Sequence, residues 1–164
     1  MKYDVVVYPD ERLKLVSSPV EKIDEELIDL INEMFRVMYE SDGCGLAGVQ
    51  IGVLHRLFVM EIKGKKYVMI NPEILEHSRD YSFQEEGCLS LPGIGAEVKR
   101  SKRVTVKYTD IDGKEKILKA AGLLAVCIQH EYDHLDGKVF IDHLPPNEKL
   151  SVLKNYRKQH NLWK

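Results

Sequence analysis

The feature that most constrains this chain is a pair of histidines four residues apart, in the stretch "QHEYDHLDG" at residues 129 to 137. Residues i and i+4 lie one above the other on an α-helix, so His130 and His134 can direct both imidazoles at one metal ion. Glu131 lies about a hundred degrees around the helix from His130, where its carboxylate can reach a water molecule without binding the metal. The alternative is an exposed histidine pair on a surface helix, so further ligands have to be sought.

A catalytic centre of the zinc type has three protein ligands and one open position, which means that a third ligand is required. The metzincin and thermolysin patterns place it after the second histidine, where this chain has Phe140 and, further on, Lys154. Cys127 shares the ligand face of the helix, but it lies about 10 Å along the axis from His134, which favours a small apolar face residue. Cys88 is the better candidate because a glycine-flanked backbone can be shaped to bring its thiolate to the helix. Burial as a small hydrophobic residue is the alternative for Cys88.

The other elements predict an α+β domain. One helix is expected over residues 25–41 after Asp24 as N-cap, and another over residues 120–136, which ends at Gly137. Two antiparallel hairpins are expected, one over residues 54–71 around Gly64 and one over residues 104–118 around the turn at Asp112 and Gly113. Residues 85–100 are expected to form a loop with a short extended piece.

Charge and cysteine content narrow the classes of function. The net charge of -2 gives no overall attraction to nucleic acid or to an anionic membrane, and no segment approaches a membrane span. Three cysteines argue against a disulfide framework and for a reducing compartment. The first residues do not resemble a signal or transit peptide. We therefore expect one cytoplasmic domain over residues 1–164, with no membrane partner and no direct contact with DNA.

Three stretches together resemble one enzyme family. "GCGLAGVQ" at residues 43–50, "EGCLS" at 86–90 and "QHEYDHLDG" at 129–137 match, in order and spacing, the three motifs of peptide deformylases. The similarity extends to "YPDERLKLVSSPV" near the N-terminus and covers nearly the whole chain. It implies a hydrolase that removes the formyl group from the N-terminal formyl-methionine of new polypeptides and releases formate. It also implies antiparallel hairpins packed around a central HExxH metal-binding helix, with an N-terminal and a C-terminal helix.

The resemblance implies roles for six residues of this chain. Cys88, His130 and His134 would hold one divalent metal ion, and Glu131 would transfer protons. The side-chain amide of Gln50 and the backbone N–H of Leu89 would stabilise the oxyanion that forms when water attacks a formamide. The implied metal is ferrous iron in the cell, and zinc, nickel or cobalt can occupy the same ligand set.

The expected substrate site includes glycines near Gln50, along which an extended peptide can lie, and an apolar stripe on the helix before His130. Core packing explains the same stripe equally well. The full expected set is Gly43, Cys44, Gly45, Glu86, Leu123, Val126 and Cys127. Behind the ligands, Gln129 is expected to steady a loop or an imidazole, and Asp133 to pair with Arg100, for which Glu86 competes.

Four positions depart from the family pattern. Gly48 stands where alanine is common, which predicts a looser loop for Gln50. Cys44 and Gln84 replace branched aliphatic residues, and Gly95 stands where some bacterial members have arginine. These positions affect the expected shape of the pocket and leave the ligands and Glu131 in place.

The segment 147–164 is predicted to be a basic helix with Leu150, Leu153 and Tyr156 on one side. One hypothesis places it against ribosomal RNA, and the alternative is an amphipathic helix that covers the domain. Two rival functions also stay open. They are a metallopeptidase that cuts an internal peptide bond, and a protein that holds a structural metal or binds peptide without catalysis.

Overall fold

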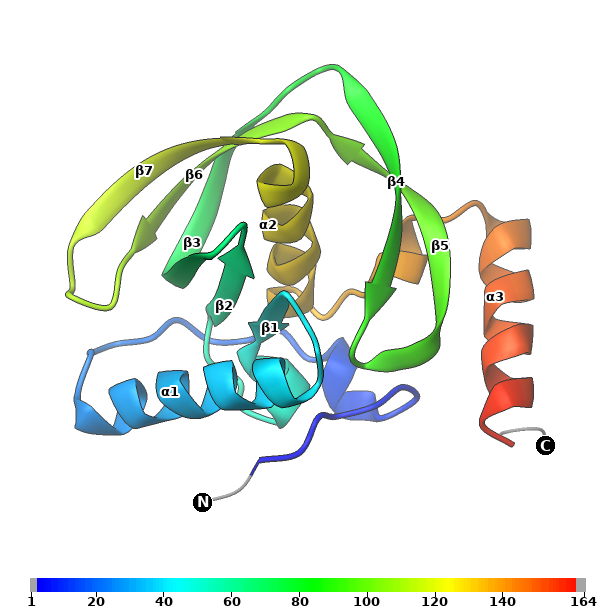
Figure 1. Cartoon of the computed structure of the whole chain (residues 1–164), viewed down its shortest axis with the longest axis horizontal. Coiled ribbons are helices and arrows are strands. Elements are labelled where there is room, and N and C mark those ends of the chain that lie inside the picture. The colour runs from blue at the N-terminus through cyan, green and yellow to red at the C-terminus, as the bar shows by residue number, and fades with distance from the viewer. Residues whose placement is uncertain (1–2, 162–164) are drawn as a thin grey trace.

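The computed structural model of the chain describes residues 3–161 and has an α+β architecture with antiparallel sheets (Figure 1). In this range the α-helices are α1 (Glu25–Glu40), α2 (Gly122–Leu135) and α3 (Pro146–Gln159). The predicted N-cap of α1 is confirmed, since the Asp24 side chain accepts a hydrogen bond from the Leu27 N–H at 2.9 Å. No helix of the described residues is both long and apolar enough to cross a membrane.

Five strands form the larger sheet in the order β1-β2-β3-β6-β7, and every neighbouring pair is antiparallel. Both predicted hairpins are confirmed, with Gly64 and Gly113 in their turns at positive φ. The segment predicted to begin the second helix at residue 120 instead ends a strand, so α2 starts at Gly122. The strands are β1 (Gly45–Ala47), β2 (Leu57–Ile62), β3 (Lys65–His77), β6 (Arg103–Thr109) and β7 (Glu115–Ala121).

The prediction of a loop over residues 85–100 is wrong. Strands β4 (Tyr81–Cys88) and β5 (Leu91–Ser101) form a second, two-stranded antiparallel sheet, and Cys88 is the last residue of its strand. The glycines and the proline of this segment suggested a loop, but Leu91 and Val98 of β5 are fully buried against residues 139–156. Burial against a remote segment therefore outweighs the weak local preference for a strand.

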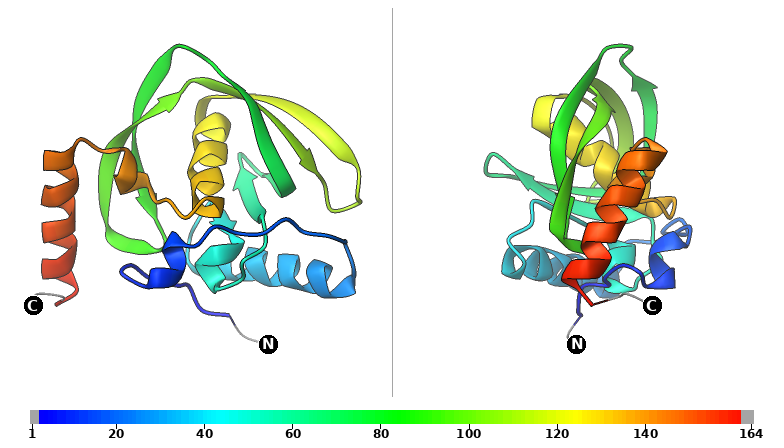
Figure 2. Two further views of the ribbon diagram at one scale, coloured as in Figure 1. Left: turned by 180° about the vertical axis from the view of Figure 1, so that it is seen from behind. Right: turned by 90° about the vertical axis from the view of Figure 1, so that its right-hand side faces the viewer.

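Two hydrophobic clusters place α1 and α2 on opposite faces of the larger sheet (Figures 1 and 2). Alternate residues of β2 belong to different clusters, as the two-residue period of a strand requires. Phe58 and Met60 pack with α2, whereas Leu57 and Val59 pack with α1. The helix that carries both histidines is therefore covered by the sheet along one side.

Helix α3 lies at the outside of the β4–β5 sheet (Figure 2). Leu153 and Tyr156 are buried as expected, and the Tyr156 hydroxyl donates to the Tyr8 carbonyl at 2.7 Å. Leu150 was predicted on the same side but is 66% exposed, because it lies about 120° around the helix from Tyr156. Residues 162–164 of the predicted helix lie outside the described residues.

A candidate metal centre and active site

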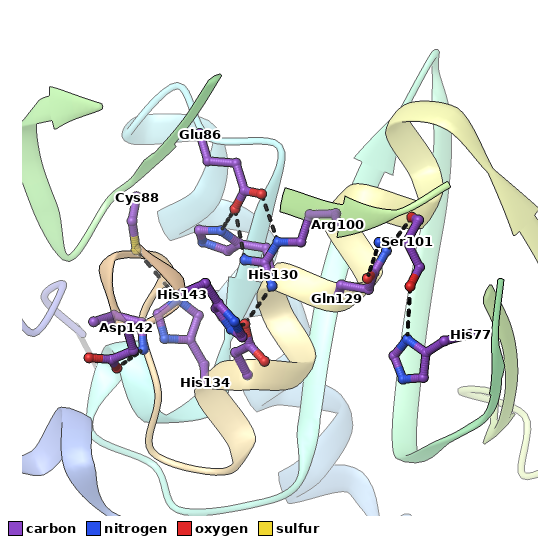
Figure 3. Close-up of polar contacts among 12 residues, drawn as sticks. His77, Glu86, Cys88, Arg100, Ser101, Gln129, His130, His134, Asp142 and His143 are labelled. Carbon is purple, nitrogen blue, oxygen red and sulfur yellow. Dashed lines mark hydrogen bonds and ion pairs between the residues drawn. The ribbon is translucent and has the colours of Figure 1, made fainter. Parts of the chain in front are cut away.

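The predicted ligands come together from two elements. His130 and His134 lie on α2 and Cys88 ends β4, and one ligand atom from each lies within 4.8 Å of the others. Cys88 Sγ is 3.4 Å from His134 Nε2 (Figure 3). Two such ligands on one tetrahedral cation would be about 3.5 Å apart, given typical zinc–sulfur and zinc–nitrogen bond lengths. The spacing and the sulfur and nitrogen donors therefore fit a divalent transition metal.

A chain of polar contacts supports His130, and it is buried at the end next to His130 (Figure 3). His130 Nδ1 lies 2.8 Å from Glu86 Oε1, and Arg100 donates to the same carboxylate at 2.7 and 2.9 Å. Arg100 also donates to Asp133 at 2.7 Å, and Asp133 lies 2.7 Å from His143 Nε2. The predicted Arg100–Asp133 pair is thus present, and the competing Glu86 is bound by the same guanidinium. With Nδ1 of His130 engaged by Glu86, its Nε2 is left free for a metal.

Gln129 holds the end of β5 to α2, and within residues 3–161 its side chain makes no hydrogen bond to an imidazole. Its side-chain oxygen accepts from the Ser101 N–H at 3.0 Å, and its amide donates to the Ser101 carbonyl at 2.9 Å and to the Ala125 carbonyl at 3.0 Å. Of its two predicted roles, steadying a neighbouring segment is the one observed. Since β5 also carries Arg100, this contact fixes the position of the guanidinium behind His130.

Glu131 is buried beside the ligands. One of its carboxylate oxygens has no hydrogen-bond partner among the described residues, and burial raises the pKa of the carboxyl to about 7. Gly45 lies against this carboxylate, because a Cβ added to it would be 2.6 Å from Glu131 Oε2. A group of this kind is suited to exchange protons near neutral pH.

The amide of Gln50 is held in one orientation. Its oxygen accepts from the Ala47 N–H at 2.9 Å, and its nitrogen donates to Ser90 Oγ at 3.1 Å and to Cys88 Sγ at 3.6 Å. The amide nitrogen therefore lies beside the Cys88 ligand. Sequence reasoning missed Ser90, although its place in the "EGCLS" stretch was a usable signal.

Gly48, expected to loosen this segment, is closely packed instead. A Cβ on it would lie 2.9 Å from the Val53 carbonyl oxygen and 3.1 Å from that of His55. The short 3-10 helix η2 (Gly48–Ile51) that carries Gln50 is buried throughout. The glycine thus permits a close backbone approach at this point.

A cavity of about 640 Å³ opens beside these groups. Among the predicted site residues, only His134 is absent from its lining, and His134 is fully buried. Leu123 is half exposed, whereas Val126 and Cys127 are buried in the wall. The predicted residues in the lining are Gly43, Cys44, Gly45, Gln50, Glu86, Cys88, Leu89, Leu123, Val126, Cys127, His130 and Glu131. Sequence reasoning missed Val5 and Ile94, which also line it and carry no motif signal.

Comparison with known proteins gives matches over most of the chain. The sequence model of the polypeptide deformylase family matches residues 2–150. A peptide deformylase of Wolbachia sp. subsp. Brugia malayi is 49% identical over 156 residues, which cover 87% of each chain. The crystal structure of a peptide deformylase from Ehrlichia chaffeensis superposes with a TM-score of 0.93 at 37% identity, covering 99% of this chain and 98% of that one. One from Legionella pneumophila superposes with a TM-score of 0.92 at 43% identity, covering 99% and 97%.

Proposed function

This chain belongs to the peptide deformylase family, metal-dependent hydrolases that remove the N-formyl group from nascent polypeptides, and we propose which of its residues perform that reaction. The observation that carries the proposal is the convergence of Cys88, His130 and His134 beside Glu131 at one cavity.

Cys88, His130 and His134 hold the metal in this proposal. The group has three members, which is the number that leaves a coordination position open in catalytic sites. A divalent cation held there supplies Lewis acidity and lowers the pKa of a water molecule toward neutrality. We propose ferrous iron as the metal in the cell, and zinc, nickel or cobalt as ions that the same ligands accept.

Glu131 acts as the general base and then as the general acid. Its buried carboxylate takes a proton from the attacking water, whose oxygen bonds to the formyl carbon. It then returns the proton to the amino nitrogen as the carbon–nitrogen bond breaks, which releases formate and a free N-terminus. The lack of a partner for one carboxylate oxygen in the described structure supports this role, because that oxygen is available to a ligand.

Gln50 and Leu89 stabilise the developing oxyanion. The Gln50 amide is oriented by Ala47 and Ser90 so that its N–H groups face Cys88. Leu89 follows Cys88 in the turn between β4 and β5, so its backbone N–H is next to the same point. One fixed donor of this type lowers the barrier by about 3 kcal/mol.

The substrate lies extended along Gly43, Cys44 and Gly45, and its methionine side chain enters the wall formed by Leu123, Val126 and Cys127. The position of β1 at one edge of the larger sheet supports this, because an edge strand can pair with a peptide. Glu86 was predicted to bind substrate. Its carboxylate is directed to His130 and Arg100, so we propose that it positions His130 instead.

The same proposal covers the whole chain. Residues 1–164 form one cytoplasmic catalytic domain around α2 as the central metal-binding helix, without a DNA partner. The segment 147–164 contacts the ribosome through basic residues, of which Lys154, Arg157 and Lys158 lie in α3. Reversal of these three charges tests the contact better than truncation, because truncation would remove the buried Tyr156. Cosedimentation with ribosomes that charge reversal leaves unchanged would dispose of the contact.

The catalytic assignment is tested by formate release from a formyl-methionine peptide beside hydrolysis of an internal peptide bond. Glu131→Gln should keep the metal, measured by elemental analysis, and lose about 10²-fold or more in kcat. Glu97→Gln, which changes an exposed carboxylate of β5, is the matched control and should keep its activity. Unchanged turnover in Glu131→Gln would reject the role of Glu131, and cleavage of the internal bond would favour a metallopeptidase.

A further inference from the structure

Two cysteines outside the proposed metal centre lie side by side in the cavity. Cys44 directly precedes β1 and Cys127 lies on α2, and their Sγ atoms are 3.7 Å apart although 83 residues separate them in the sequence. Both residues line the cavity. Neither thiol takes part in the proposed chemistry, although both residues line the proposed substrate site.

The two thiols differ in access. Cys44 is exposed, whereas Cys127 is buried in the cavity wall behind it. A small reagent in solution therefore reaches Cys44 first, and Cys127 is placed to react with whatever forms there. Cys88 is a poorer partner, because its sulfur lies against His134 and Gln50.

The pair also lies next to the proposed base. Gly45, the residue after Cys44, leaves no room for a Cβ in front of the Glu131 carboxylate. Cys127 precedes Glu131 by one helical turn on α2. Any change that draws residues 43–45 toward α2 therefore acts directly on Glu131 and on the space proposed for the methionine side chain.

We propose that Cys44 and Cys127 form a reversible disulfide that lowers the activity of this enzyme under thiol-oxidising conditions. The effect on activity rests on the proposed function, and the formation of the disulfide does not. The oxidant is a low-molecular-weight disulfide. The cysteine pair would then be a modification site in the cavity that responds to the ratio of small disulfides to small thiols in the cell.

The reaction is two successive thiol–disulfide exchanges. The Cys44 thiolate attacks one sulfur of the small disulfide, which forms a mixed disulfide and releases one small thiolate. The Cys127 thiolate then attacks the Cys44 sulfur, which forms the protein disulfide and releases the second small thiolate. The two protons lost by the cysteines end on the two released thiols, and two electrons pass from the protein to the small disulfide.

The bond shortens the distance between the two sulfur atoms from 3.7 Å to about 2.05 Å. Backbone or side-chain movement has to supply this change, and the close contact between Gly45 and Glu131 leaves little free space for it. A displacement of about 1 Å at a reacting group can reduce the rate by about 10²-fold. We therefore expect the oxidised protein to lose about tenfold or more in kcat/KM.

The experiment uses the zinc-loaded full chain, because zinc does not change oxidation state. The reduced protein is first assayed for formate release, then treated with excess oxidised glutathione, alkylated and mapped by mass spectrometry. The expected product has lost two hydrogen atoms and yields a linked peptide that contains Cys44 and Cys127. Activity should fall at the rate at which this peptide appears, and dithiothreitol should restore it.

Cys44→Val and Cys127→Ala are the matched variants, and each is compared with its own reduced form. After treatment with oxidised glutathione, Cys44→Val should contain no link and should retain the activity measured in its own reduced form. Cys127→Ala should accumulate glutathione on Cys44. The proposal is wrong if the wild type carries only glutathione adducts, if the link joins Cys88, or if Cys44→Val loses as much activity as the wild type. A reduced protein without formate release would refute the proposed function, while the peptide map still decides whether the disulfide forms.

Discussion

Arg100 bridges the carboxylate of Glu86, which contacts His130, and the carboxylate of Asp133. We expect Arg100→Met to destabilise the fold strongly. The Arg100 side chain is 4% exposed and donates to Glu86 at 2.7 and 2.9 Å and to Asp133 at 2.7 Å. Methionine is flexible and similar in length, so it removes the charge while leaving much of the packing. The change therefore measures what the cation does for one buried and one half-buried carboxylate.

The loss of stability in Arg100→Met depends on whether the carboxylates stay charged without the guanidinium or take up a proton. At an effective dielectric constant of about 20, a unit charge about 4 Å away is worth about 4 kcal/mol. A carboxylate that loses this can take up a proton instead, which at pH 7 costs about 4 kcal/mol for a group of ordinary pKa. Both routes cost the same, so the free energy of unfolding should fall by about 4 kcal/mol, which is within the range of about 3–5 kcal/mol for broken buried ion pairs.

Urea unfolding, monitored by circular dichroism, measures this loss in the free energy of unfolding. Both proteins are compared with metal bound and after chelation, because a bound metal adds its own stabilisation. The control is Arg103→Met, since Arg103 pairs with Asp80 at 3.0 Å but the two side chains are 61% and 45% exposed. Loss of this exposed pair should cost less than about 1 kcal/mol.

The pH dependence provides a second check. Burial alone would raise the pKa of Glu86, but hydrogen bonds from Arg100 and His130 outweigh it, so the pKa lies below its ordinary value. At Asp133, burial alone would likewise raise the pKa. The hydrogen bond from His143 and the charge of Arg100 outweigh it, so the pKa of Asp133 also lies below its ordinary value. Stability from lowered carboxyl pKa values is present above their unfolded values and is lost as the pH falls through the folded values.

In Arg100→Met the buried carboxyls should titrate above their unfolded pKa values, so acid removes less stability from the variant than from the wild type. The difference between the two proteins should therefore shrink from pH 7 to pH 5. A difference below about 1 kcal/mol at pH 7, or one that widens as the pH falls, would refute the reasoning.

Three further changes have expected outcomes. Gln50→Ala should lower kcat for formate release by about 10²-fold with a smaller change in KM, and an effect on KM alone would contradict an oxyanion role. Gly45→Ala should lower kcat with an unchanged circular dichroism spectrum, because its Cβ would lie 2.6 Å from Glu131 Oε2. Gly87→Ala is the control, because a Cβ on Gly87 would lie 3.6 Å from its nearest neighbour, the Ile94 carbonyl oxygen. Equal losses of kcat in the two variants would contradict the steric reason. Asp110→Ala should lower the free energy of unfolding by about 1–2 kcal/mol, since Asp110 accepts two backbone N–H groups in the β6–β7 turn; Asp110→Asn should lose less.

Elements with a strong local pattern were predictable from the sequence. Helix α1 follows its N-cap Asp24 and its apolar periodicity, and the hairpins follow their turn glycines and alternation. The β4–β5 hairpin was missed because its apolar residues are spaced around Gly93 and Gly95, and its stability depends on burial of Val98 against a later segment. A local pattern cannot report a partner that lies forty residues further along the chain.

The site residues also fall into those that the local sequence places together and those that only tertiary packing brings together. The sequence by itself determined that His130, Glu131 and His134 share one end of a helix, because short-range hydrogen bonds set the helical period. Only the tertiary structure decided that Cys88 reaches them and that Cys44 meets Cys127. These approaches depend on how apolar surfaces of remote segments pack together, and that packing has no local signature in the chain.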